Sequence, residues 1–344
     1  MAVRTLDPKR QSYKAEALAS RLSLRIVGQT GPTQALLSAI AKYQSGFYDK
    51  TKPIFSMLGL GPTGVGKTGV FEAFAEGLFG SPKHMLKVDC AEFQHSHEIA
   101  KLVGSPPGYL GHRETHPFFT NASLAALRTP ELDFTIVLWD EIEKASDSLW
   151  NLLLGILDKG TLTTGTNEKV DMTKTVHLMT SNVGSADISD EASIGFDAGQ
   201  KQMTDQQVSD TVMAAARRKF MPEFLGRLDE IAVFKTLTES EIAEVLGLQL
   251  NDLSDRIMLS APVPFEFNVS PAAIRQLLKE GYDRRYNARG LKHVIEKHIA
   301  LPLGRLMSTG QVMPNDIIIV DFDQNWKYYA QIPLARAAAE GDIL

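Results

Sequence analysis

The segment GPTGVGKT, residues 61–68, matches the phosphate-binding pattern G-x-x-x-x-G-K-[ST] in full. Its glycines allow backbone N–H groups to turn toward phosphate oxygens, and Lys67 brings a positive charge to the β- and γ-phosphates. The hydroxyl of Thr68 is an oxygen ligand of the kind that Mg²⁺ prefers. The sequence therefore predicts a site for ATP and Mg²⁺. Its residues are Gly61, Pro62, Thr63, Gly64, Val65, Gly66, Lys67, Thr68 and Gly69.

Two adjacent carboxylates follow the apolar run IVLW, residues 136–139. We expect Asp140 to hold the Mg²⁺ shell together with Thr68, through a water molecule, and Glu141 to polarise the water that attacks the γ-phosphate. Adjacent acids at the end of a strand are common and indicate little alone. Together with the upstream glycine-rich loop, they predict an enzyme that hydrolyses ATP to ADP and phosphate, with Lys67 among its catalytic residues.

Short apolar runs alternate with helical patterns over most of the chain. Strand-like runs cover residues 53–61, 84–93, 134–141, 175–182 and 231–237, and segments with helical spacing lie between them, for example 36–48 and 68–80. Alternating strands and helices indicate a parallel sheet with helices on its faces. We therefore expect an α/β fold that places the glycine-rich loop and the two carboxylates at the ends of neighbouring strands.

After Phe234 the pattern becomes mainly helical. Thr238 and Glu241 form a capping-box pattern, and Pro271 follows Ser270 at the start of another helix. A further helix is expected over 288–307 and a short strand over 316–322. The expected organisation has four parts: an N-terminal helical extension (1–25), a large α/β ATPase domain (26–235), a small, mainly helical C-terminal lid domain (236–325) and a tail (326–344).

Composition limits the classes of partner. The 344 residues carry a net charge of −5, which gives no general attraction to nucleic acid or to an anionic membrane. The one cysteine, Cys90, rules out an internal disulfide framework. No signal peptide or membrane-spanning run is recognisable, so we expect a cytoplasmic protein without a membrane partner, and we consider nucleic acid unlikely as one.

Five further motifs resemble the second ATPase module of the Clp unfoldases and disaggregases, a branch of the AAA+ ATPases that includes ClpA and ClpB. The resemblance covers about residues 26–322 and implies a P-loop AAA+ fold with a small lid domain, acting as a single-module chain in a homo-oligomeric ring, a hexamer in that family. The motifs are DEIEKA (140–145), LLGILDKGTLT (153–163), MTSNVGS (179–185), FMPEFLGRLDEIAVF (220–234) and GYDRRYNARGLKHVI (281–295).

The resemblance implies roles for residues beyond the phosphate loop. Asn182 matches the polar sensor that helps to orient water at the γ-phosphate. Arg227 matches the arginine finger offered to the nucleotide of a neighbouring subunit, and Arg289 matches a second sensor that links the small domain to the phosphates. Ile26 and Val27 match the segment that packs around adenine.

The segment GSPPGYLG, residues 104–111, resembles the pore loop of the same family. Glycines and prolines disfavour a regular helix or strand there, so the ring of Tyr109 is expected on a loop. The resemblance implies that Gly108, Tyr109, Leu110 and Gly111 contact a polypeptide substrate in the centre of a ring.

A second loop motif, Ile194-Gly195-Phe196, resembles the segment with which ClpA-like unfoldases dock a ring-shaped peptidase. It is short, and an ordinary loop is the competing interpretation. The chain also departs from the family pattern. No coiled-coil middle insertion or preceding ATPase module is recognisable in the given residues, so we expect a single-module chain, and His112 and Arg113 make the segment after the pore loop more basic.

The motifs leave two functions from different classes open. The first is an ATP-driven remodeller that pulls polypeptides, delivered directly or by an adaptor, through a ring with its Tyr109 loops. The second is an AAA+ assembly or regulatory ATPase that loads or disassembles one protein or nucleic-acid complex without threading. A third interpretation is a piece of a longer protein, although residues 1–25 do not resemble the end of an ATPase module.

Overall fold

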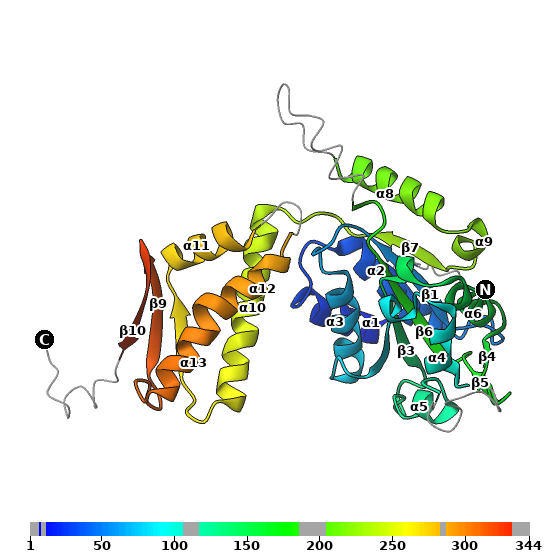
Figure 1. Cartoon of the computed structure of the whole chain (residues 1–344), viewed down its shortest axis with the longest axis horizontal. Coiled ribbons are helices and arrows are strands. Elements are labelled where there is room, and N and C mark those ends of the chain that lie inside the picture. Colours follow the sequence, from blue (N-terminus) through cyan, green and yellow to red (C-terminus); the bar gives the residue numbers. More distant parts are fainter. Residues whose placement is uncertain (1–6, 8–11, 106–116, 186–203, 283–286, 332–344) are drawn as a thin grey trace, which may run out of the picture. The chain divides into compact units, whose positions relative to one another are not determined.

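The computed structural model describes residues 7, 12–105, 117–185, 204–282 and 287–331. Two compact units are recognised: one contains residues 1–62 and 66–235, and the other contains residues 63–65 and 236–344 (Figure 1).

The first unit is built on a parallel five-stranded sheet with the strand order β2-β3-β6-β1-β7. This confirms the expected parallel α/β fold, and each of its strands overlaps a segment predicted as a strand. In the central pair, Leu60 of β1 is in register with Ser181 of β6, so both strands end at the same edge of the sheet. The strands are β1 (Phe55–Leu60), β2 (Met85–Asp89), β3 (Thr135–Asp140), β6 (Thr175–Ser181) and β7 (Glu230–Val233).

Helices connect these strands (Figure 1). The longer ones are α1 (Tyr13–Ser23), α2 (Thr30–Ser45), α3 (Lys67–Phe79), α6 (Asp147–Lys159) and α8 (Asp205–Lys219). The shorter ones are η1 (Cys90–Phe93), η2 (Ser96–Ile99), α4 (Ala100–Val103), α5 (Asn121–Ala125), η3 (Ile142–Lys144) and α9 (Pro222–Leu225). The sequence does not predict a small antiparallel pair, β4 (Thr161–Thr163) and β5 (Lys169–Asp171), which the structure contains.

The buried centre of the sheet contains a chain of polar side chains that the sequence does not suggest. His177 of β6 is completely buried, and its Nδ1 accepts a hydrogen bond of 3.0 Å from Trp139 Nε1 of β3. Its Nε2 lies 2.8 Å from Thr175 Oγ1, which in turn donates to the carbonyl oxygen of Met172 at 2.6 Å. The ring is therefore a neutral tautomer with its proton on Nε2, and both of its nitrogens have a partner.

The second unit combines helices with a three-stranded sheet of order β10-β9-β8. Thr238 caps α10 as predicted: its side chain accepts from Glu241 N, and its own N–H donates to Glu241 Oε2 at 2.7 Å. The helices are α10 (Glu239–Ser260), α11 (Pro271–Gly281), α12 (Arg289–Ile295), the π-helical turn η4 (Glu296–Ala300) and α13 (Leu301–Ser308).

The sheet of this unit is larger than the single strand that the sequence predicts. The strands are β8 (Glu266–Val269), β9 (Ile317–Asp323) and β10 (Asn325–Gln331). β10 pairs antiparallel with β9 over its full length, so regular structure extends past residue 326, the expected start of the tail. In the part of the chain that is described, no helix has both the length and the apolar character that crossing a bilayer requires.

Candidate active site

The phosphate loop joins the end of β1 to the start of α3. Two of its glycines are required by their backbone. Gly61 has φ 151°, and a Cβ there would lie 2.5 Å from the carbonyl oxygen of Phe234. Gly66 has φ 93° and precedes α3 without any side-chain cap, so the first N–H groups of that helix have no capping side chain as acceptor. Such a helix start binds phosphate well because its amides and its dipole both favour an anion.

Lys67 is the first residue of α3 and is only 6% exposed. Its ammonium donates to the carbonyl oxygens of Gly61 and Pro62, each at 2.7 Å, and to Asn182 Oδ1 at 2.8 Å. Burial lowers the pKa of Lys67 to about 8, and the nearby carboxylates, Glu143 foremost, oppose this shift. The side chain is therefore largely charged at neutral pH, in a place where an anion would stabilise that charge.

Asp140, at the end of β3, lies beside the first turn of α3. Its Oδ1 accepts from Thr68 Oγ1 at 3.0 Å and from Thr180 Oγ1 at 2.5 Å, and its Oδ2 lies 3.3 Å from Lys87 Nζ. The close approach of the Thr68 hydroxyl and the Asp140 carboxylate brings together the two expected Mg²⁺ ligands.

Glu141 and Asn182 meet at the ends of adjacent strands. Asn182 Nδ2 donates to Glu141 Oε1 at 3.2 Å while its Oδ1 accepts from Lys67, so one amide connects the lysine of the phosphate loop with the expected general base. Glu141 has φ 55°, a left-handed conformation that is uncommon outside glycine, and its N–H donates to Thr180 Oγ1 at 2.9 Å. Backbone strain of this kind concentrates at functional sites.

These groups fit ATP and Mg²⁺. The uncapped start of α3 and the buried Lys67 suit the phosphates, and the oxygens of Thr68 and Asp140 suit a cation that binds through few protein ligands and several waters. The described residues contain no group of three or more His, Cys, Asp or Glu side chains that could hold a metal ion by themselves.

Comparison with known families decides the class of this site. A family model described as "AAA domain (Cdc48 subfamily)" matches residues 52–231, just over half of the chain, and one described as the C-terminal, D2-small domain of ClpB protein matches residues 237–320. The chain belongs to the AAA+ ATPase family. It is an ATPase, and its two units correspond in sequence to the large domain and the small domain of this family.

Among individual relatives, this AAA+ chain is similar to Clp proteins. The ATP-dependent Clp protease ATP-binding subunit ClpC of Staphylococcus saprophyticus is 34% identical over 312 residues, which cover 90% of this chain and 37% of that protein. ClpC of Staphylococcus aureus strain USA300 is 34% identical over 319 residues, 92% of this chain and 38% of the relative. The AAA+ chain thus spans less than two-fifths of the length of these curated relatives.

Solved structures of Hsp104 show the same AAA+ fold. A closed-state reconstruction of Hsp104 with ATPγS and FITC casein matches with a TM-score of 0.77 at 27% identity, covering 92% of this chain and 52% of that one. The extended conformation of the Saccharomyces cerevisiae Hsp104–casein complex matches with a TM-score of 0.76 at 26% identity, covering 93% and 53%.

Arg227 lies at the other end of β1 from the phosphate loop. It follows α9, and its carbonyl oxygen is 3.4 Å from the hydroxyl of Ser56, the second residue of β1. Its guanidinium pairs with Glu223 Oε1 at 2.8 Å and lies 3.7 Å from Asp158 Oδ1 of α6. The hydrogen bond to Glu223 is the main reason that the pKa of Arg227 is raised.

The other predicted residues fall in several places. Ile26 and Val27 are partly buried between α1 and α2, and Arg289 is the first residue of α12 in the second unit. Their proposed contacts with adenine and with the phosphates stay predictions. The pore-loop residues 108–111 and the candidate docking residues 194–196 lie outside the described residues.

Sequence reasoning missed three residues of the site. Thr180 holds Asp140 and the Glu141 backbone, Lys87 of β2 pairs with Asp140, and Glu143 Oε1 accepts from Asn182 N at 3.2 Å. The other oxygen of Glu143 is buried without a hydrogen-bond partner, a position that a water or a ligand group would satisfy. For Thr180, a signal was present, because it precedes Asn182 by two residues and strand alternation places both on one side.

Proposed function

We propose that this AAA+ ATPase acts as a ring that uses ATP hydrolysis to remodel or unfold protein substrates. The observation that carries the proposal is the separation of Arg227 from the phosphate loop of its own chain. The Arg227 segment contacts Ser56 at the start of β1, whereas the loop begins at Gly61, beyond the end of this strand. Five strand residues span about 16 Å.

That distance exceeds the reach of the side chain. An arginine extends about 7 Å from its Cα, and the Arg227 segment sits at the end of β1 that points away from the phosphates. A guanidinium in this place is useful for phosphoryl transfer only to the nucleotide of a neighbouring subunit. Repeating such a head-to-tail contact generates a ring where the rotation between subunits closes, and the resemblance to Clp proteins favours a closed hexamer.

Within one subunit, the residues of the site divide the work of hydrolysis. Lys67 and the amides of the loop hold the phosphates, Thr68 and Asp140 hold Mg²⁺, and Glu141 polarises the attacking water while Asn182 fixes its carboxylate. Mg²⁺, when bound, supplies positive charge to the β- and γ-phosphate oxygens. The neighbour's arginine finger adds charge that stabilises the transition state.

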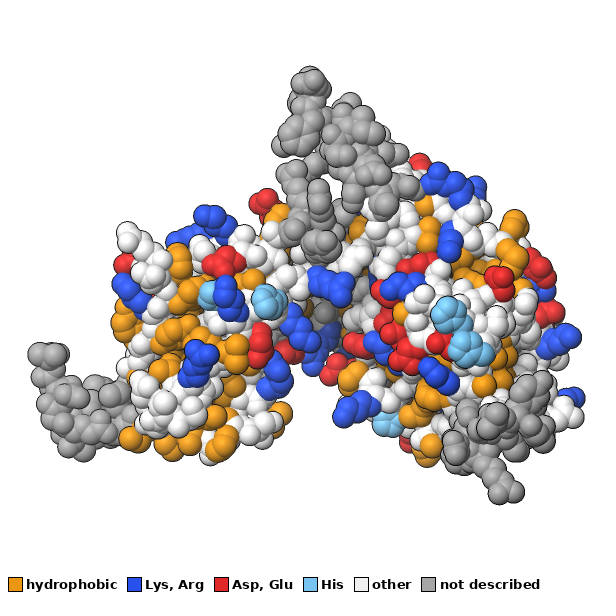
Figure 2. Space-filling model, in the orientation of Figure 1, with side chains coloured by type: hydrophobic (Ala, Val, Ile, Leu, Met, Phe, Trp, Pro, Cys, Tyr) orange, Lys and Arg blue, Asp and Glu red, His pale blue; other side chains and the backbone are white. Residues whose placement is uncertain are grey.

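We further propose that the substrate is a polypeptide gripped by the Tyr109 loops and pulled through the ring. Support comes from the GSPPGYLG motif and from the Hsp104 structures, which were solved with casein. Adaptors would then select substrates, and Ile194-Gly195-Phe196 is the candidate contact for a ring peptidase. A mixed surface does not favour nucleic acid: in the view of Figure 2, acidic and basic side chains both appear on each unit.

The test compares Tyr109→Ala with Tyr109→Phe in the presence of casein. If the loop grips polypeptide through its aromatic face, casein stimulates the ATPase of the wild type and of Tyr109→Phe but not of Tyr109→Ala, whose basal rate is retained. Glu141→Gln should bind ATP and hydrolyse it at least about a hundredfold more slowly. If casein does not change the ATPase rate, and Tyr109→Ala hydrolyses ATP at the same rate as wild type, the protein would instead be an assembly factor that does not thread its client.

A further inference from the structure

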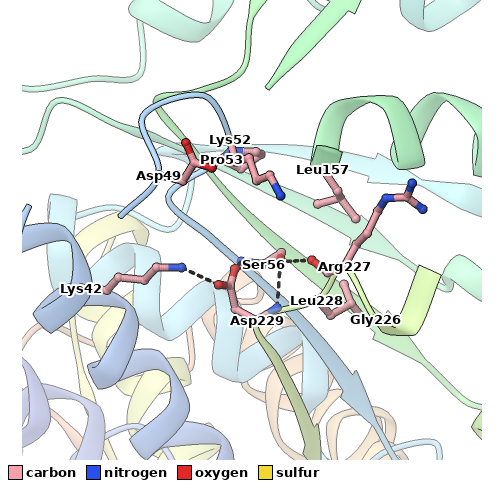
Figure 3. A pocket seen from close by; sticks show the side chains of 10 residues that line it. All are labelled: Lys42, Asp49, Lys52, Pro53, Ser56, Leu157, Gly226, Arg227, Leu228 and Asp229. Atoms are coloured by element: carbon pink, nitrogen blue, oxygen red, sulfur yellow. Dashed lines mark hydrogen bonds and ion pairs between the residues drawn. The ribbon is translucent and has the colours of Figure 1, made fainter. Parts of the chain in front are cut away.

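A hydrogen-bonded cluster joins the Arg227 segment to the start of β1 (Figure 3). The backbone N–H of Ser56 donates to Asp229 Oδ2 at 2.8 Å, and the Ser56 hydroxyl donates to the same oxygen at 2.9 Å. In return, the N–H of Asp229 donates to the carbonyl oxygen of Ser56 at 3.0 Å. These bonds extend the pairing of β1 with β7 by one residue beyond its first ladder pair, Met57 with Glu230.

Lys42 of α2 completes the cluster. Its ammonium donates to Asp229 Oδ1, so both carboxylate oxygens are occupied. The side chains of Lys42 and Asp229 are 31% and 33% exposed, which leaves this ion pair partly shielded from solvent. A charge-assisted contact of this kind ties α2, β1 and the Arg227 segment to one carboxylate.

Asp229 acts on Arg227 through the backbone. Figure 3 shows the guanidinium of Arg227 directed away from Asp229 and Lys42, and its ionic partners are Glu223 and Asp158 instead. A cavity of about 310 Å³ lies beside the segment 226–229, so packing alone does not hold this side of it in place. The hydrogen bonds of Asp229 therefore help to hold the segment 226–229 in place on this side.

β1 connects this anchor to the subunit's own nucleotide. The strand runs from Phe55 to Leu60, is buried along its whole length and leads directly into Gly61 and the phosphate loop. We propose that Asp229, with Ser56 and Lys42, is a positioning residue that fixes the arginine finger to β1. When the nucleotide of one subunit displaces the carboxyl end of β1, the anchored Arg227 therefore moves with the strand. This movement changes the position of Arg227 at the nucleotide of the neighbouring subunit. This inference rests on the proposed ring with Arg227 acting between subunits.

The first experiment compares Asp229→Ala and Asp229→Asn with Asp133→Ala, a control that removes another aspartate paired with a lysine, Lys174, on the same unit. A loosened finger should lower kcat roughly ten- to hundredfold and leave KM and the affinity for ATP within about twofold. Asp229→Asn should lose less because an amide oxygen still accepts from Ser56. The control should match wild type. An Asp229→Ala enzyme with wild-type kcat, or with a loss confined to KM, would overturn the proposal.

Mixed rings separate positioning from general damage to the fold. Glu141→Gln subunits have an intact finger but no hydrolysis, so in a 1:1 mixture with Asp229→Ala about a quarter of the interfaces pair an intact finger with a competent site. Activity should reappear in that mixture, but not when Asp229→Ala is mixed with Arg227→Ala. If mixing with Glu141→Gln restores ATPase activity to Arg227→Ala but not to Asp229→Ala, the proposed positioning role of Asp229 is wrong, while the proposed ring with Arg227 acting between subunits is supported. If neither is rescued although mixed rings form, the proposed function itself fails.

Discussion

At the scale of single residues, Asn182 is the side chain that connects the candidate catalytic groups to one another. Its amide accepts from Lys67 and donates to Glu141, while its backbone N–H donates to Glu143. A phosphate that draws Lys67 away therefore frees one end of this amide. The same event changes the surroundings of Glu141, whose backbone is already held in a left-handed conformation.

The lowered pKa of Lys67 predicts how ATP binding depends on pH. Burial brings this pKa to about 8, and bound phosphate favours the charged form, so binding should be tightest below pH 8 and weaken above it. From pH 7.5 to pH 9 we expect the affinity for ATP to fall roughly tenfold, as the charged fraction of the free lysine falls. Titration of a fluorescent ATP analogue measures this change.

Lys67→Arg is the control for that titration, because a guanidinium keeps its charge throughout this pH range. Its affinity for ATP should be weaker but should not change between pH 7.5 and 9. A wild-type affinity as insensitive to pH as that of Lys67→Arg would show that Lys67 does not titrate near 8.

At the scale of elements, the sheet that carries the site is joined across β3 and β6 by the buried hydrogen bonds of Trp139, His177 and Thr175. Complete burial lowers the pKa of His177 to about 3, so the ring is neutral at all ordinary pH values. β3 ends at Asp140, and β6 ends one residue before Asn182. These hydrogen bonds therefore help to keep the two strand ends, and the candidate catalytic residues on them, together.

His177 should make the fold sensitive to mild acid. A folded pKa of about 3 lies below the unfolded value, so its stabilising contribution is complete above pH 6.5 and is lost as the pH falls toward 3. Between pH 7 and pH 5 the loss from this residue should be about 2 kcal/mol. Urea unfolding at the two pH values measures it.

His177→Gln should be less stable at pH 7, since Trp139 loses its acceptor, but should lose less further stability at pH 5. His97→Gln, which changes an exposed histidine, should keep the acid sensitivity of the wild type. Equal acid sensitivity in His177→Gln and wild type would contradict this role for the buried ring.

Elements of the sheets differ in how far the sequence predicts them. The five parallel strands are recognisable because each is an apolar run bounded by glycine, polar residues or helical patterns. β4 and β5 have three residues each and form only by pairing with one another, and β8 and β10 carry polar residues on an exposed sheet. Such strands depend on partners distant in the chain, which local patterns do not reveal.

The residues of the candidate site also differ in whether the sequence predicts them. Lys67, Thr68, Asp140, Glu141 and Asn182 belong to motifs, and the structure brings them within hydrogen-bonding distance of one another. The positioning contacts of Thr180, Lys87 and Asp229 were not predicted. Each joins segments that lie far apart in the sequence, and threonine, lysine and aspartate are common on surfaces, so their types alone carry no signal. Only Thr180 had a signal of another kind, its two-residue spacing from Asn182 on a predicted strand.

At the scale of the whole molecule, the residues of the candidate ATPase site lie at the carboxyl end of β1, and Arg227, the proposed arginine finger, lies at its amino end. If Arg227 serves a neighbouring subunit, as proposed, hydrolysis by a single subunit would lack that finger. The enzyme's turnover is therefore expected to be a property of the assembly, whatever substrate it acts on.

The measurement that tests this claim most directly is the ATPase rate per subunit as a function of protein concentration, with sedimentation at the same concentrations. We expect the rate per subunit to rise steeply where rings form, and Arg227→Ala to form rings but stay at least about a hundredfold slower. A rate per subunit that is constant down to concentrations where only monomers sediment, and equal in Arg227→Ala, would contradict the need for a finger from a neighbour.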